Sequence, residues 1–139
     1  MDKTLDTVLL MLEGSTITLE IFCVTLALSL PLGLFAALGR LSRFRLLSRL
    51  LEVYIWIMRG TPLMLQLLFV YFALPMVGIL LPDIAAALLA FVLNYAAYFA
   101  EIFRSGIQAI PRGQFEAARA LGMSAPLTMR RIILPQVLR

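Results

Sequence analysis

The sequence predicts an all-α integral membrane protein with three transmembrane helices and a cytoplasmic elbow of two short helices. Of the 139 residues, 62% are hydrophobic and 14% charged, and the mean hydropathy is +0.96. Soluble domains are roughly 45–50% apolar, and one small core could not bury this much apolar surface. Three stretches, 21–39, 60–82 and 84–100, carry no charged residue. Their lengths fall in the range of about 17–25 residues with which a helix crosses a bilayer.

The first predicted span covers about residues 16–39 and is expected to be retained. Its flank, MDKTLDTVLLMLEG, holds three acidic residues and one lysine, whereas a secretory signal begins with positive charge. Small or hydroxylated residues recur along this span at helical spacing, a pattern typical of a surface that meets another helix closely. They are Thr18, Thr25, Ser29, Gly33 and Ala36.

Two elements are expected between the first and third spans. Residues 44–58 are predicted to form a helix at the cytoplasmic interface, because leucines recur there at three-to-four spacing among arginines. Thr61 is a good N-cap and Pro62 a good first helical residue, so the second span is expected at about 61–81.

The third predicted span, about residues 83–105, has one polar face. Within an arc of about 100° on a helix lie Ala86, Ala90, Asn94, Ala97, Glu101, Ser105 and Gln108. This face is expected toward the bundle interior or a watery path. Two alternatives are that Asn94 only bonds a neighbouring helix and that Glu101 only pairs with Arg104 or Arg59. The opposite face is expected to meet lipid, through Leu88, Val92, Phe99 and Phe103.

The basic residues predict the orientation of the chain in the membrane. Eleven of the twelve lie between spans one and two or after span three, at Arg40, Arg43, Arg45, Arg49, Arg59, Arg104, Arg112, Arg119, Arg130, Arg131 and Arg139. Two crossings separate these segments, so both lie on one side, and positive charge concentrates in the cytoplasm. The N-terminus is therefore expected outside. The net charge of +4 is explained by topology and predicts no nucleic-acid partner.

Several residue types are scarce, and this restricts the chemistry. The sequence has no histidine, one cysteine (Cys23) and one lysine (Lys3). No catalytic histidine arrangement, zinc site or phosphate-binding loop with its lysine is built from this chain alone. We therefore expect no catalytic residue and no metal here, and any ATP to be bound by another chain.

Residues 112–136 are predicted to form the elbow of two short helices. Gly122 is expected to end the first as a left-handed cap. Ser124 is expected to cap the second, with Pro126 in its first turn and Pro135 closing it. Each helix is too short to be stable alone in water. The elbow must therefore dock against its own chain or a partner.

The elbow resembles a known motif at every position. Its residues Glu116, Ala117, Ala118, Gly122, Ile132, Leu134 and Pro135 have the spacing of the EAA loop. That loop marks the membrane subunits of binding-protein-dependent ABC importers. Two further stretches, RGTPLMLQLLFVYFALP from Arg59 and LNYAAYFAEIFRSGIQAIPRGQFEAA from Leu93, resemble the polar amino-acid permeases.

The resemblance implies an amino-acid import permease of five spans in the bacterial inner membrane. It implies a dimer with a second copy or a sister permease, a cytoplasmic ABC ATPase and an extracytoplasmic amino-acid-binding protein. The EAA loop would couple the permease to the ATPase, which would hold ATP and magnesium, so that this chain binds no cofactor. The chain stops at Arg139. It is expected to be one C-terminally incomplete domain, either part of a longer protein or a truncated product that does not transport.

Candidates for lining or gating the path are Arg59, Gly60, Thr61, Pro62, Gln66, Asn94 and Glu101. Three other functions are alternatives to transport driven by a separate ATPase. A small helical membrane protein of structural or assembly type would not associate with an ATPase. A membrane enzyme needs an aligned nucleophile and base, which the spans lack. A gradient-driven transporter predicts internal repeats, which the sequence does not show.

Overall fold

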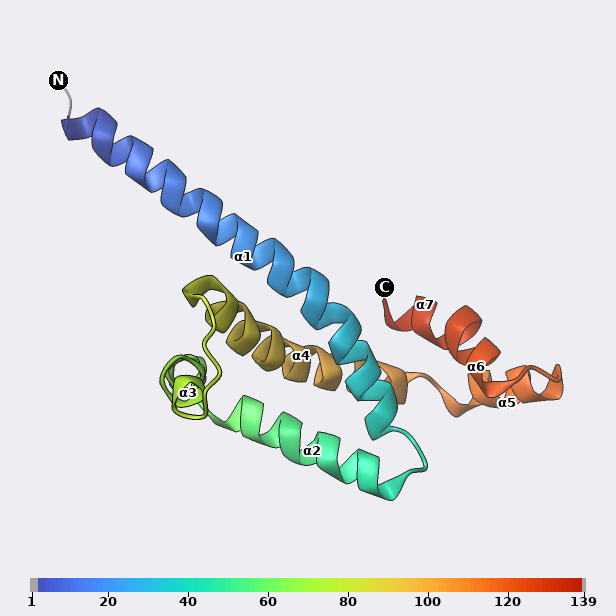
Figure 1. The fold of residues 1–139 in the computed structure, drawn as a ribbon. Coiled ribbons are helices and arrows are strands. Elements are labelled where there is room, and N and C mark those ends of the chain that lie inside the picture. The colour runs from blue at the N-terminus through green and yellow to red at the C-terminus, as the bar shows by residue number, and fades with distance from the viewer. Residues whose placement is uncertain (1–2, 139) are drawn as a thin grey trace.

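The computed structural model describes residues 3–138, and this part of the chain folds into helices joined by short turns. In chain order they are α1 (Lys3–Arg40), α2 (Arg45–Gly60), α3 (Leu63–Met76), α4 (Asp83–Ala109), α5 (Arg112–Ala120), α6 (Ala125–Thr128), the π-helical turn η1 (Met129–Ile133) and α7 (Leu134–Val137). The first four form a bundle, and α5 to α7 form a hook beside the C-terminal end of α4 (Figure 1). The predicted all-α class is confirmed.

α1 packs along α4 through the predicted stripe of small residues. Ser29 is fully buried, and a Cβ added at Gly33 would lie 2.5 Å from the Cβ of Phe99. Thr25 and Ala36 are buried as well, whereas Thr18 is exposed. α1 begins well before the predicted span, because residues 3–15 are mostly good helix formers and contain no proline. Its N-terminal part therefore projects beyond the bundle (Figure 1).

The second span differs from the prediction. α3 has 14 residues, about 21 Å of helix at 1.5 Å per residue, against a hydrocarbon core of ~30 Å. Within residues 3–138, α1 and α4 are each long and apolar enough to cross a membrane, while α2 and α3 qualify only as one pair bent by 106°. α3 ends before Gly78, whose φ of +84° is left-handed and terminates the helix.

The start of α3 also differs from the prediction, which made Thr61 its N-cap. Thr61 instead ends α2, because Pro62 disfavours a helical conformation for the residue before it; its hydroxyl donates back to the carbonyl oxygen of Ile57 at 2.8 Å. Pro62 occupies the N-cap and Leu63 begins the helix. The break between α2 and α3 therefore falls at Thr61 and Pro62.

α4 is the central helix, and the expectation that its Val92, Phe99 and Phe103 face lipid is wrong, because Phe99 packs on Gly33 of α1 and the other two are buried. Val92 is 7% exposed and Phe103 is 8% exposed. Both lie on the stripe that includes Ala96 and Ala100, to which Gly33 of α1 packs. α2 and α3 contact α4 as well, and Ala90, Asn94 and Ala97 are buried as predicted. The helix therefore has neighbours on two sides, whereas the sequence reasoning assumed one.

Candidate functional site

The elbow formed by α5, α6, η1 and α7 contains the sequence-predicted motif. Gly122 has a φ of +71°, a conformation that residues with a Cβ rarely adopt. The N–H groups of Gly122 and Met123 donate to the carbonyl oxygens of Arg119 and Ala118 at 2.9 and 3.0 Å. These bonds close the end of α5 in the manner of a glycine C-cap. The predicted left-handed cap is confirmed.

The motif residues divide between the inside and the outside of the elbow. Ala118 is buried, while Glu116, Ala117 and Leu121 are exposed, Leu121 by 79%. In the second arm, Ile132 and Leu134 are half-buried and Pro135 is exposed. Ala118 thus lies on the covered side of α5, and Glu116 and Ala117 lie on the outer surface.

The second arm of the elbow departs from prediction at Pro135. Ser124 occupies the N-cap of α6 as expected, but its side chain makes no capping hydrogen bond; its carbonyl oxygen accepts the N–H of Thr128 at 2.9 Å. Pro135 was expected to close the helix, but it lies in the first turn of α7, which continues to Val137. A proline fits there because η1 interrupts the α-helical hydrogen bonding before it, and the first turn needs no intrahelical N–H donor.

Three of the predicted path candidates meet in one hydrogen-bonded network. The Asn94 amide donates to Gln66 Oε1 at 2.9 Å and to the Met58 carbonyl oxygen at 3.0 Å. Gln66 Nε2 donates to Thr61 Oγ1 at 2.6 Å and to the same Met58 oxygen at 2.9 Å. Asn94 is 4% exposed. The network therefore ties the α2–α3 break to α4, as the interhelical alternative for Asn94 predicted.

Tyr54 belongs to the same junction, and sequence reasoning did not place it there. Its hydroxyl donates to the carbonyl oxygen of Leu93, the residue before Asn94 on α4. Tyr54 and Met58 are one helical turn apart and flank the buried Ile55. No sequence signal could have revealed these two contacts, because both acceptors are backbone carbonyls.

Charged residues gather around a second site along the C-terminal half of α2. A cavity of about 350 Å³ is lined by Arg40, Glu52, Ile55, Trp56, Arg59, Gly60 and Glu101. Arg40 pairs with Glu52 at 2.9 Å, and the Arg59 guanidinium lies 5.5 Å from the centre of the Tyr98 ring. Glu101 pairs with Arg104, whose Nε is 3.0 Å from its carboxylate. This is the pairing that the alternative for Glu101 predicted. Two arginines and two glutamates thus face one space.

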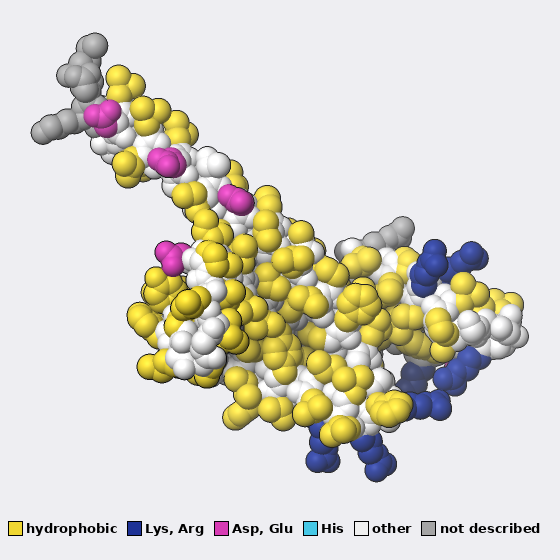
Figure 2. Space-filling view, in the orientation of Figure 1, with side chains coloured by type: hydrophobic (Ala, Val, Ile, Leu, Met, Phe, Trp, Pro, Cys, Tyr) yellow, Lys and Arg dark blue, Asp and Glu magenta, His cyan; other side chains and the backbone are white. Residues whose placement is uncertain are grey.

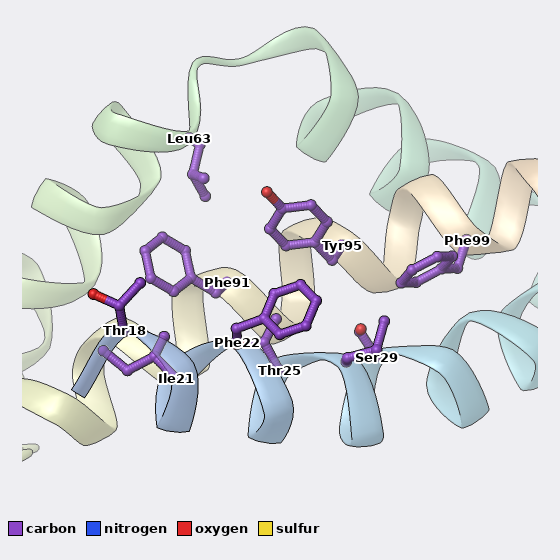
Figure 3. Close-up of a pocket in the computed structure, with 10 residues that line it drawn as sticks. Thr18, Ile21, Phe22, Thr25, Ser29, Leu63, Phe91, Tyr95 and Phe99 are labelled. Atoms are coloured by element: carbon purple, nitrogen blue, oxygen red, sulfur yellow. The ribbon is translucent and has the colours of Figure 1, made fainter. Parts of the chain in front are cut away.

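A third hollow lies between α1 and α4 beside the start of α3 (Figure 3). Its volume is about 410 Å³, and rings of Phe22, Phe91 and Tyr95 surround it. Among the described residues, the buried hydroxyls of Thr25 and Ser29 have no hydrogen-bond partner. The lining is mainly apolar, as on a surface for packing. Within residues 3–138, no cluster of three or more His, Cys, Asp or Glu side chains could hold a metal.

The chain is similar in sequence to known proteins over most of its length. A family model described as "Binding-protein-dependent transport system inner membrane component" matches residues 29–139. The probable amino-acid ABC transporter permease protein YckA of Bacillus subtilis (strain 168) is 44% identical over 92% of this chain and 57% of its own length. The arginine transport system permease protein ArtQ of the same strain is 42% identical over 98% and 63%. The putative glutamine transport system permease protein GlnP of Rickettsia bellii is 40% identical over 95% and 61%.

Two solved structures share the fold. A crystal structure of an amino acid ABC transporter with histidines gives a TM-score of 0.78 at 37% identity, covering 94% of this chain and 64% of that one. An inward-facing MetNI methionine ABC transporter gives 0.68 at 23% identity, over 99% and 66%, and so supports the fold alone. The chain spans 57 to 63% of the length of the three relatives named above.

Proposed function

This chain belongs to the family of inner membrane components of binding-protein-dependent transport systems, and we propose that it forms the amino-acid path of an ABC importer and couples it to an ATPase. The family expected from the motif is confirmed, and with it a multi-pass protein of the cell membrane. The observation that carries the proposal is the elbow. Its motif residues fold into a projecting hook with the left-handed Gly122 at the bend.

The proposed orientation has the N-terminus outside and the elbow in the cytoplasm of a bacterial cell. The distribution of charge supports it (Figure 2). Acidic side chains lie along the N-terminal part of α1 and at Asp83, where α4 begins. Basic side chains gather around the turn from α1 to α2 and on the elbow. Positive charge on that side agrees with a cytoplasmic location.

The outer face of the elbow is the proposed contact for a cytoplasmic ABC ATPase. Glu116, Ala117 and Leu121 are exposed there, while Ala118 and Gly122 shape the bend. ATP and magnesium would be held by the ATPase, and this chain would bind no cofactor. An extracytoplasmic binding protein and a second permease, either a copy or a sister subunit, would complete the importer.

The proposed path passes the charged cavity near Arg59, Gly60 and Glu101. Paired charges around one cavity suit a gate. Because partly solvent-exposed ion pairs contribute little free energy, they exchange partners at a low free-energy cost. Thr61, Pro62, Gln66 and Asn94 would position this gate by fixing the α2–α3 break. ATP binding by the partner would move α4 and turn the path outward.

The proposed substrate is a polar or charged amino acid. ArtQ is named for arginine transport and GlnP for glutamine transport. A gate with both charge signs would match a zwitterion, which carries an ammonium and a carboxylate. The binding protein would make the final choice among amino acids.

Reconstitution of the permease with its ATPase and binding protein in liposomes tests this function. We expect ATP-dependent amino-acid uptake, and ATPase activity that the loaded binding protein stimulates. Gly122→Val is expected to abolish uptake, since a β-branched residue at positive φ is strained. Gly122→Asn is the matched control, because asparagine tolerates that conformation. Unchanged uptake by Gly122→Val would refute the coupling role, and a permease that never co-purifies with an ATPase would favour a structural membrane protein.

A further inference from the structure

The second arm of the elbow returns to α4 and touches it at Gly106. A Cβ built on Gly106 would lie 2.8 Å from Cγ1 of Val137 and 3.8 Å from its Cβ. Separations below 3.0 Å are essentially never seen for real Cβ atoms. α7 can therefore reach this position only because residue 106 has no side chain.

Val137 has little freedom to avoid such a clash. A valine in a helix has one strongly preferred rotamer, so its methyl groups do not turn aside easily. One turn earlier in the arm, Ile133 is fully buried, so the arm is packed on this side as well. On α4, Phe103 and Ile107 are buried beside Gly106. The contact is thus stiff on both sides.

Among the glycines from Gly106 onward, only Gly106 makes a close approach. Nothing lies within 4 Å of a Cβ added at Gly113 or Gly122. Gly113 gives a comparison site, since its φ is not in the left-handed region and its surroundings are open.

The contact joins the elbow to α4 a second time. The first junction is covalent, at Ile110 and Pro111, which follow α4 directly. An elbow attached to α4 only at this junction would pivot about it. An elbow that also contacts α4 through α7 moves together with α4. We propose that Gly106 is a positioning residue that seats α7 on α4, so that α4 and the elbow move as one rigid body during transport. This rests on the proposed function, in which the elbow receives the movement of the ATPase.

A disulfide between the two positions tests the rigid contact directly. The Cβ–Cβ separation of 3.8 Å equals the mean of about 3.8 Å in protein disulfides. The variant is Gly106→Cys with Val137→Cys, in a Cys23→Ala background that removes the single native cysteine. We expect the bond to form in membranes under mild oxidation, both without nucleotide and with ATP trapped on the ATPase. The oxidised permease should keep its uptake and its stimulated ATPase activity.

Three results of that experiment overturn the proposal. They are absence of the disulfide in both nucleotide states, formation in one state only, and loss of uptake on oxidation that a reductant restores. The first would mean that α7 does not sit on α4, and the other two that the contact must open during the cycle. The disulfide is read from gel mobility and needs no transport. If the assembled wild type imports no amino acid, the proposed function fails while this readout still decides the contact.

A compensating pair of substitutions tests the role of the missing side chain. Gly106→Ala should lower the uptake per ATP hydrolysed by on the order of tenfold, which corresponds to about 1.4 kcal/mol, because the added methyl group overpacks the contact with Val137. Adding Val137→Ala removes the opposing methyl groups and should restore the ratio, whereas Gly113→Ala should leave it unchanged. The ratio separates coupling from folding, because fewer folded molecules lower uptake and hydrolysis together. Failure of Val137→Ala to rescue would show that the contact does not act in this way.

Discussion

The two covered sides of α4 are held in different ways. On the α1 side, Gly33 allows backbone and Cβ atoms to come into direct contact with Phe99, Ala96 and Ala100. On the α2–α3 side, Asn94 and Gln66 form a polar network around the Met58 carbonyl. Close packing of backbone and Cβ atoms permits one arrangement of the two helices, whereas side-chain hydrogen bonds can exchange partners. α1 and α4 are thus joined by close packing of their backbones, whereas the α2–α3 break is joined to α4 through a few side-chain hydrogen bonds.

The largest effect is expected from breaking the α1 side at Gly33. A Cβ there would lie 2.5 Å from Phe99 Cβ, 3.0 Å from the Ala96 oxygen and 3.1 Å from the Ala100 nitrogen. Gly33→Leu should destabilise the protein by ~3 kcal/mol or more, at the upper end of overpacking costs, because backbone atoms cannot turn aside. The measurement is thermal unfolding in detergent.

Gly14→Leu is the control for Gly33, since nothing lies within 4 Å of Gly14 on the same helix. Its melting temperature should match the wild type. Equal melting of the two variants would contradict the close contact between α1 and α4.

A smaller effect is expected from breaking the polar side at Asn94. Asn94→Leu removes the bonds to Gln66 and Met58, and interhelical hydrogen bonds in membranes average ~0.6 kcal/mol and reach ~1.7. We expect a loss of about 1–2 kcal/mol and a weaker dependence of uptake on ATP. Gln114→Leu on the exposed surface of α5 is the control. A loss as large as that of Gly33→Leu would remove the distinction between the two sides.

The smallest effect on stability is expected at Glu101. Glu101→Gln breaks a partly exposed ion pair with Arg104 three residues away, and such helical pairs contribute ~0.2–0.5 kcal/mol. Salt should reduce the difference further. The gate proposed near Arg59 requires a clear change in uptake with little change in melting. A variant that transports as the wild type does would remove Glu101 from the gate.

Features that depend on the type and spacing of residues close together in the chain were predictable from the sequence. The spacing of Ser29 and Gly33 predicted the α1 packing surface, and Gly122 predicted the left-handed bend. Asn94 stood out as an amide in an apolar span and bonds a neighbouring helix as one alternative held.

Features that depend on tertiary partners were not predictable. The Tyr54 hydroxyl donates to the Leu93 carbonyl oxygen, and the Met58 carbonyl oxygen accepts from Asn94. Both acceptors are backbone atoms, which every residue has, so the sequence does not reveal these contacts. Val92 is buried because α4 has neighbours on two sides. Pro135 looks like a helix end until the preceding π-helical turn is known.

The most direct test of coupling through the elbow is photocrosslinking from two leucines of similar exposure. Leu121 at the tip of the elbow is 79% exposed, and Leu10 near the start of α1 is 74% exposed. A photoreactive residue replaces each in turn, within the permease assembled with its ATPase in native membranes. We expect the ATPase to be crosslinked from position 121 and not from position 10. Crosslinking from position 10, or from neither position, would contradict coupling through the elbow.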